Sequence, residues 1–152
     1  MVLSGGGEVF RLPLQPSATD RHAVLVRALP ELRTRLPVAV AVPRYVGVLP
    51  DGSTPFTAEP ELPGAPPASL GSIAVGQLAG VLAALAAVPE REAQQWGVPG
   101  TGSLLHGALD GSALLYDPSR GLLSGIVGWR PRLGDPDEDL RTLPEAVRTA
   151  LG

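Results

Sequence analysis

Cysteine, lysine and asparagine are absent from this sequence of 152 residues, and its twelve basic residues are all arginine. Without cysteine the chain forms no disulfide and offers no thiolate to a metal ion or substrate, while the redox compartment stays open. A P-loop needs its lysine, and protein kinases use a lysine on the phosphates and an asparagine on magnesium. Neither scheme is complete here, whether the absences reflect function or a genome biased toward Arg, Ala, Gly and Pro.

Strong charge and long apolar runs are also lacking. The formal net charge is −3 and the arginines are scattered, so no basic field attracts nucleic acid. The first residues, MVLSGGGEVFRL, lack the basic start and apolar core of a secretory signal, and we expect a cytoplasmic protein. The apolar run over residues 72–88 is too short and too rich in Ala and Gly for a membrane span; it predicts a buried helix.

Short strands are expected in the first part of the chain. Ser4 and the three following glycines predict a hairpin between MVL and EVFRLPL, because glycine supplies the positive φ of a tight turn. VAVAV, residues 38–42, and RYVGVLP, residues 44–50, predict further strands. Asp51-Gly52 predicts a turn into PFTAEPEL, whose prolines at 55 and 60 favour an edge strand.

Helices are expected where apolar residues recur every three or four positions. Thr19 or Asp20 can cap a helix that Pro30 interrupts and keeps short. Ser72 can cap a second helix, which Pro89 closes. The predicted buried faces contain Val24, Leu25, Ala28 and Leu29 in the first helix and Leu78, Val81, Leu82 and Leu85 in the second.

The last third of the chain combines a hairpin with short helices. EREAQQWG predicts one turn of helix that ends at Gly97. SALLYD and GLLSGIV predict two strands around the turn PSRG. Thr142 and Glu145 have the spacing of a capping box for a final helix that ends at Leu151.

A specific motif frame occupies residues 103–140. HGALDGSALLYD, GIVGW and LGDPDEDL follow one another at the spacing of the catalytic segment of the aminoglycoside phosphotransferase-like small-molecule kinases, which the chain resembles. The matching residues are His106, Gly107, Leu109, Leu114, Leu115, Asp117, Trp129, Gly134, Asp135, Pro136 and Asp139. A looser similarity covers most of the chain, with EVFRLP and PFTAEPELPG resembling strands and the inter-lobe hinge of the N-terminal lobe.

The resemblance implies an α+β fold, a reduced kinase-like domain with a small antiparallel sheet and a helical part that carries a β-hairpin. We expect one truncated domain in which residues 1–62 form the N-lobe-like part, 63–71 a connector and 72–152 a partial C-lobe. The first strand of the usual N-lobe and the helices after the Gly-Asp-Pro segment have no counterpart in the sequence.

The departures from the family fall on the residues that carry its chemistry. Ala108 stands at the position of the catalytic Asp, and a methyl group accepts no proton. Ala113 replaces the metal-binding Asn, and Gly128 replaces the metal-binding Asp. No catalytic residue is therefore intact and no metal site is expected. Arg11 occupies the position of the family's phosphate-contacting Lys or Arg. His22 stands where the resemblance places the Glu that pairs with it, so that ion pair is predicted to be absent.

Several residues remain candidates for ligand binding, each with a structural alternative. His106 either contacts a ligand or supports the loop, and Asp110 either replaces the lost acid or caps a turn. Asp135 and Asp139 brace the loop and helix or bind metal, and Trp129 is a ligand platform or a core residue. Arg11 completes this set. Ser103, His106 and Asp110 lack the elbow motif of a serine hydrolase.

Three functions remain open. The first is a catalytically inactive kinase-like module, without cofactor, that binds a small molecule or protein or acts as a structural partner. The second is a residual small-molecule or aminoglycoside phosphotransferase that uses ATP or GTP with magnesium, and the third is a decayed gene product without a selected role. A homodimer is expected because the missing segments uncover faces near Val2 and Ala79, unless the loops fold over them.

Overall fold

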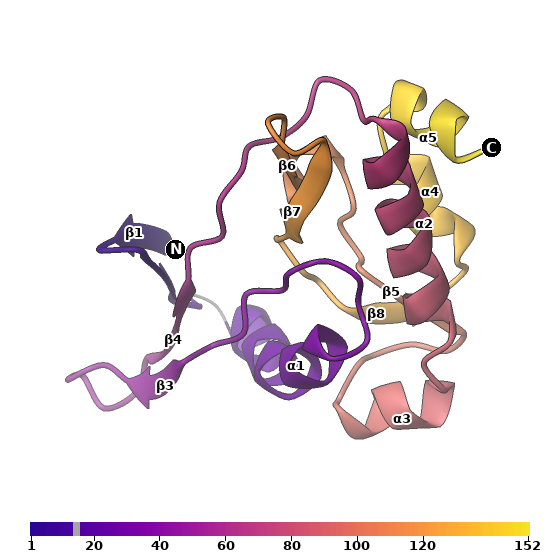
Figure 1. The fold of residues 1–152 in the computed structure, drawn as a ribbon. Helices are drawn as coiled ribbons and strands as arrows, with labels where there is room; N and C mark the ends of the chain where they lie inside the picture. Colours follow the sequence, from indigo (N-terminus) through magenta and orange to yellow (C-terminus); the bar gives the residue numbers. More distant parts are fainter. Residues whose placement is uncertain (14–15) are drawn as a thin grey trace.

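The N-terminal part of the chain forms a four-stranded antiparallel sheet in the order β1-β2-β4-β3 (Figure 1). The computed structural model describes residues 1–13 and 16–152. The strands are β1 (Val2–Gly5), β2 (Glu8–Arg11), β3 (Tyr45–Val48) and β4 (Pro55–Pro60). Gly6 and Gly7 make the β1–β2 turn with φ angles of 63° and 79°, which confirms the predicted hairpin.

Two expectations about this sheet were wrong. β4 lies between β2 and β3, not at an edge, because Pro55 and Pro60 are its first and last residues and interrupt no hydrogen bond within the strand. Residues 38–42 form no strand; Val40 makes a single bridge with Ile126, and the carbonyl oxygen of Ala39 accepts the N–H of Ile126. Its valines at 38 and 40 are buried in the core, which explains the apolar alternation.

The first helix, α1 (Pro16–Arg33), is longer than predicted. It continues through Pro30, although an interior proline removes one hydrogen bond. Ala28, Leu29 and Leu32 on either side of Pro30 are buried in the core, and this packing offsets the cost of the proline. The prediction that Thr19 or Asp20 caps the helix was wrong, because both residues lie within it.

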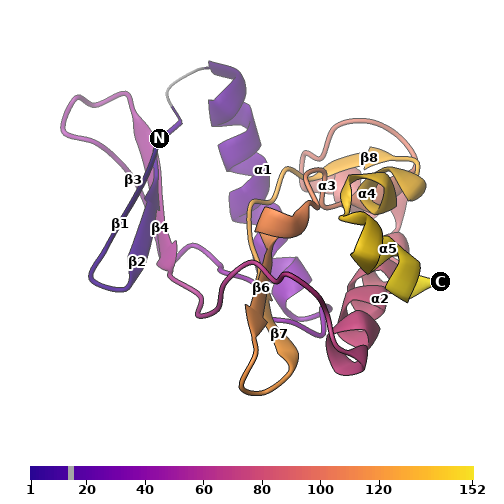
Figure 2. The same cartoon turned by 90° about the horizontal axis from the view of Figure 1, so that it is seen from above.

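The C-terminal part has the predicted helical character with a hairpin. Its helices are α2 (Ser72–Ala86), α3 (Glu90–Gln95), α4 (Asp137–Thr142) and α5 (Glu145–Leu151). β6 (Leu114–Asp117) pairs with β7 (Leu122–Ile126), and β5 (Ser103–Leu105) pairs with β8 (Arg132–Gly134). α1 lies between the N-terminal sheet and these elements (Figure 2). The predicted α+β class is confirmed.

Both capping predictions in this part were wrong. Gly71 is the N-cap of α2, and no side chain caps that helix, so Ser72 is its first residue. Thr142 is the last residue of α4, and its hydroxyl donates to the backbone carbonyl oxygens of Leu109 and Asp139. α5 instead starts after Pro144, whose carbonyl accepts the first helical hydrogen bonds.

The hydrophobic core is formed by α1, the segment after it, and the C-terminal elements. Leu32, Leu78, Leu104, Leu114 and Ile126 are among its fully buried side chains. None of the described residues of β1 to β4 belongs to this core. Within the described residues, no helix has both the length and the apolarity to cross a membrane.

Candidate active site

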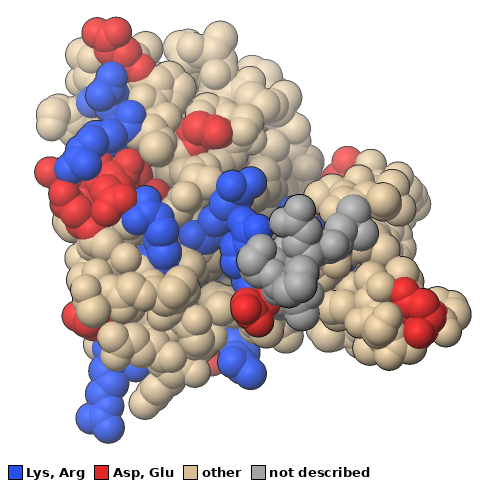
Figure 3. Space-filling model, turned by 180° about the vertical axis from the view of Figure 1, so that it is seen from behind, with Lys and Arg blue, Asp and Glu red and all other residues tan. Residues whose placement is uncertain are grey.

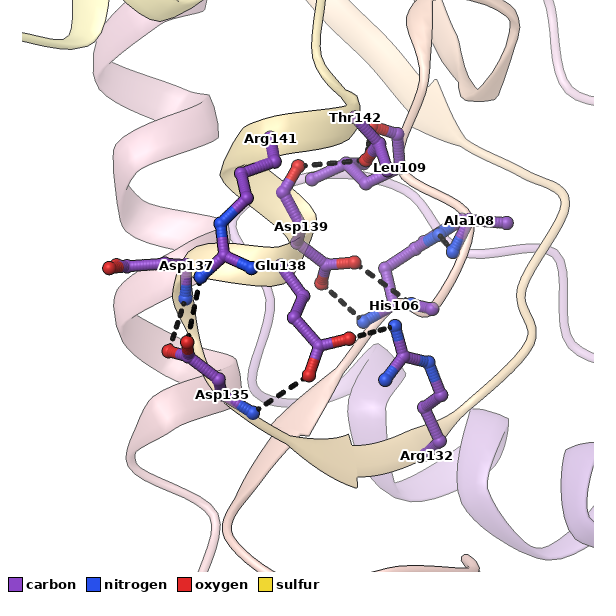
Figure 4. Close-up of polar contacts among 11 residues, drawn as sticks. His106, Ala108, Leu109, Arg132, Asp135, Asp137, Glu138, Asp139, Arg141 and Thr142 are labelled. Atoms are coloured by element: carbon purple, nitrogen blue, oxygen red, sulfur yellow. Dashed lines mark hydrogen bonds and ion pairs between the residues drawn. The ribbon is translucent and has the colours of Figure 1, made fainter.

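One buried carboxylate holds the loop that resembles the catalytic segment of the small-molecule kinases (Figure 4). Asp139, on α4, is 2% exposed, and its two oxygens accept the backbone N–H groups of His106 at 2.6 Å and Gly107 at 3.0 Å. Two bonds to one ionised group are short and strong, so they fix the backbone where β5 ends. Asp139 therefore braces the loop, which is the structural alternative given for it above.

His106 is held inside the protein by both ring nitrogens. Its Nε2 lies 2.9 Å from the carbonyl oxygen of Val127, and its Nδ1 accepts the N–H of Ala108 at 3.2 Å. These partners correspond to a neutral ring with the proton on Nε2. Burial lowers the pKa of His106 below its usual 6.5, and the Val127 carbonyl works against this shift.

Trp129 packs against the same histidine. The two ring centroids are 4.4 Å apart, and the indole Nε1 donates to the carbonyl oxygen of Ile126 at 3.1 Å. Trp129 is 8% exposed, so most of its ring fills the core and a single edge borders the cavities described below. His106 and Trp129 together form the support beneath the loop.

Asp110 is engaged in local structure. Its Oδ1 accepts the N–H groups of Ser112 at 2.8 Å and Ala113 at 3.2 Å, and caps a short 3₁₀ helix (Gly111–Ala113). The Ser112 hydroxyl also donates to it and is the largest cause of the lowered pKa of this exposed carboxyl. A lower pKa makes Asp110 a weaker base than a free aspartate.

The three positions that should supply a base and two metal ligands carry no oxygen in their side chains. Ala108 is half-buried in the loop, Ala113 is buried at the end of the 3₁₀ helix, and Gly128 is exposed just beyond β7. Gly128 has φ 73°, and a Cβ atom placed there would meet nothing within 4 Å. Magnesium requires oxygen ligands, so the side chains at these positions do not fit a magnesium ion.

The acidic residues around α4 are joined to arginines and to the backbone. Asp135 accepts the N–H of Asp137 at 3.1 Å and pairs with Arg141 at 2.8 Å; the first of these contacts is the main cause of its lowered pKa. Glu138 pairs with Arg132 at 2.6 Å. In the described parts of the chain, no group of three or more His, Asp or Glu side chains is arranged to hold a metal ion.

Arg11 has an acidic partner that sequence reasoning missed. Its guanidinium contacts Glu59 Oε1 at 2.7 Å through Nε and at 2.6 Å through Nη2, so the partner comes from β4 and not from the first helix. The strand register explains this pair, because Val9 pairs with Glu59 and Arg11 points to the same side of β2 as Val9. Between Arg11, Glu59 and Gly128 only about 20 Å³ is open, room for about one water molecule.

The structure brings His106, Trp129, Arg11 and Gly128 around one region between the sheet and the β6–β7 hairpin, because Arg11, Gly128 and Trp129 line the same cavity and His106 packs on Trp129. Asp110 and Asp135 do not line that cavity. His22 on α1 is 8% exposed and borders a neighbouring cavity that Arg11 and Trp129 also line.

No protein-family model matches the sequence, and no curated protein matches it. The fold, however, is similar to solved structures of antibiotic phosphotransferases. An aminoglycoside phosphotransferase in complex with GDP and kanamycin has a TM-score of 0.81 and 21% identity over 97% of this chain and 70% of that chain. Macrolide 2′-phosphotransferase MphH from Brachybacterium faecium has a TM-score of 0.75 and 21% identity over 95% and 67%. These TM-scores show a shared fold, and this chain spans 70% and 67% of the length of the two proteins.

Proposed function

Because the chain has the fold of the aminoglycoside and macrolide phosphotransferases, we propose that it is a catalytically inactive form of that fold, a binding or structural module. The observation that carries this proposal is the chemistry of three side chains. Ala108, Ala113 and Gly128 occupy the loop positions of the base and of both metal ligands, on a backbone that Asp139 still holds in place.

Phosphoryl transfer depends on positioning and on neutralising charge. The attacking hydroxyl must be oriented or deprotonated, and magnesium must bridge the phosphate oxygens. Ala108 offers no acceptor for the first task. Asp110 lies two residues further on and uses Oδ1 to cap the 3₁₀ helix, which directs that oxygen toward the backbone of Ser112 and Ala113. The loss therefore removes parts of the mechanism itself, and not a fraction of its efficiency.

The Arg11–Glu59 pair supports the same proposal. A phosphate that took over the Nε and Nη2 contacts of Arg11 would displace a carboxylate that is 5% exposed, and would leave it buried without this partner. Such an unpaired buried charge costs several kcal/mol. The cavity that Arg11 shares with Gly128 is also small, at about 20 Å³, and does not by itself accommodate a nucleotide. We accordingly propose that neither ATP nor GTP with magnesium is a cofactor of this chain.

The proposal is tested by transfer of the terminal phosphate of labelled ATP or GTP to kanamycin or to a macrolide, with and without magnesium. The expected rate equals that of a blank without protein, while an active aminoglycoside phosphotransferase measured in parallel gives product. Calorimetry with the same nucleotides separates binding from turnover. Magnesium-dependent product above the blank would overturn the proposal and favour a residual phosphotransferase.

A further inference from the structure

A second cavity beside the first is lined by basic side chains. It has a volume of about 230 Å³ and lies between the β1–β2 hairpin, α1 and the segment after β7. Arg11, Arg21, Arg130 and His22 line it, together with apolar side chains that include Leu25 and Trp129. No Asp or Glu is among its described lining residues. On the face seen in Figure 3, basic side chains gather near the middle of the molecule.

Two of these arginines have no acidic partner among the described residues. Arg35, Arg44, Arg132 and Arg141 each pair with a carboxylate. Among the described residues, neither Arg21 nor Arg130 forms an ion pair. Arg130 and Arg132 are two residues apart, yet only Arg132 is neutralised. Like charges that face one cavity repel each other unless an anion lies between them.

His22 provides an independent observation. Among the described residues its buried Nε2 has no hydrogen-bond partner, and His22 is 8% exposed at the wall of the cavity. A buried polar atom without a partner is costly, so such an atom in a native protein calls for a missing partner. The groups around His22 are Arg11 on β2, Glu59 on β4 and Arg21 on its own helix, and the cavity adds Arg130.

From these observations we propose that the cavity of Arg21, His22 and Arg130 binds a phosphate group, either inorganic phosphate or the phosphate of a small monoester, without a metal ion. This site goes beyond the proposed loss of catalysis and does not depend on it. The side chains concerned lie on α1 and after β7, outside the loop that carries Ala108 and Ala113.

The chemistry of His22 selects phosphate among the common anions. Burial lowers the pKa of His22 and so favours the neutral ring, although a backbone hydrogen bond with Phe56 partly opposes this. A neutral ring has one nitrogen that accepts a hydrogen bond, and Nε2 is the nitrogen without a partner among the described residues. A monoester phosphate with a second pKa near 6 carries both an O–H donor and anionic oxygens near neutral pH. Sulfate carries no such O–H, and can meet the arginines but not the neutral Nε2.

The cavity leaves space beside the phosphate. Its apolar walls, Leu25 and the edge of Trp129, suit the organic part of a monoester. Free phosphate and an ester share the same anionic group, so the two sources are separated by comparing inorganic phosphate with phenyl phosphate.

Titration calorimetry of the full chain tests the proposal, in EDTA, near pH 6, where the P–OH is abundant. We expect inorganic phosphate or phenyl phosphate to bind at millimolar concentration or below, and sulfate to bind at least about fivefold more weakly, because one hydrogen bond is missing. The more tightly bound of the two phosphates identifies the source. Arg130→Gln should weaken binding about tenfold or more, since a charge-assisted contact is lost.

The matched control is Arg27→Gln. Arg27 is on the same helix but borders a different cavity, next to Gly97 and Pro131, and its loss should change phosphate affinity less than about twofold. His22→Leu should remove the preference for phosphate over sulfate. The proposal is overturned if neither phosphate binds, if sulfate binds as tightly, or if Arg27→Gln weakens binding as much as Arg130→Gln does.

Discussion

Glu59 holds Arg11 through a single carboxylate oxygen, with Nε at 2.7 Å and Nη2 at 2.6 Å, across the neighbouring strands β2 and β4. The two side chains differ in exposure, at 29% for Arg11 and 5% for Glu59. Among the described residues, Arg11 is therefore the only ion-pair partner of the buried carboxylate, whereas the guanidinium can reach water. This asymmetry determines how the pair responds to substitution.

Removing Arg11 should cost more stability than removing Glu59. Arg11→Gln leaves a buried carboxylate unpaired and should lower the free energy of unfolding by about 2–4 kcal/mol. Glu59→Gln leaves an arginine that can turn to solvent, and should cost about 1–2 kcal/mol. Urea unfolding measures both. The control is Arg44→Gln in the exposed pair with Glu8, which should cost less than about 1 kcal/mol. Equal losses for the first two variants would contradict the asymmetry.

Restoring one acid should not restore catalysis. Ala108→Asp returns a base to the loop, but positions 113 and 128 still supply no oxygen to magnesium, so phosphate transfer should stay at the level of the blank. Transfer from labelled ATP and GTP is the measurement, with Ala108→Asn as a matched variant that adds a similar volume without a base. Product formed by Ala108→Asp alone would show that magnesium is held by other residues.

Asp139→Asn should loosen the loop. Its two oxygens accept two backbone N–H groups, and an amide can accept only one of these and places a donor against the other. The expected loss is about 2–4 kcal/mol in the free energy of unfolding. Asp135→Asn, at an exposed acid two residues before α4, is the control and should cost less than about 1 kcal/mol. Hydrogen exchange at the amides of His106 and Gly107 should rise in Asp139→Asn alone.

Stability should fall as the pH falls below 6.5. The folded protein holds His106 neutral because burial lowers its pKa, so the unfolded chain binds the proton first. The free energy of unfolding thus falls as the pH drops from 6.5 to the lower pKa of the folded state, and it falls no further below that pKa. Unfolding in urea at a series of pH values should give a smaller slope for His106→Asn. Part of the slope should remain, since the pKa of His22 is lowered as well. A slope unchanged by His106→Asn would refute this role.

The chain is predicted to self-associate. Val2 on the edge strand β1 and Ile73 at the start of α2 are 58% and 62% exposed, and Ala79 on α2 is also exposed. A stable dimer would bury roughly 1,200–2,000 Å² of such surface. Light scattering after size-exclusion chromatography at micromolar concentration should give a dimer mass, and Val2→Arg or Ala79→Arg should return the monomer. A monomer mass for the unaltered chain would exclude the dimer.

Much of the fold could be predicted from local pattern. The turns at Gly6-Gly7 and Asp51-Gly52, the apolar stripe of α2 and the β6–β7 hairpin depend on residues close together in sequence. The errors about α1 and residues 38–42 arose because contacts between residues far apart in the sequence determine the structure there. Pro30 stays inside α1 because its neighbours pack on the core, and residues 38–42 are drawn into the core instead of into a sheet.

The sequence suggested residues for the candidate site but not the pairs that they form. The sequence indicated that Ala108, Ala113 and Gly128 carry no base or ligand, and this follows from their side chains alone. It gave no sign that Glu59 is the partner of Arg11, since 48 residues separate them and the strand order was unknown. The cavity of Arg21, His22 and Arg130 likewise depends on how α1 is placed beside the end of β7.

The sheet of β1 to β4 affects the order in which parts of the protein unfold. None of its described residues belongs to the shared hydrophobic core, so we expect the sheet to be a cooperative unit of lower stability that opens while α2, the hairpin and α5 stay folded. Arg11 and Glu59 belong to this unit, whereas Arg130 and Trp129 belong to the rest. Amide exchange should therefore occur in two classes. A ligand that contacts both units would slow the faster class, because opening the sheet would then also release the ligand.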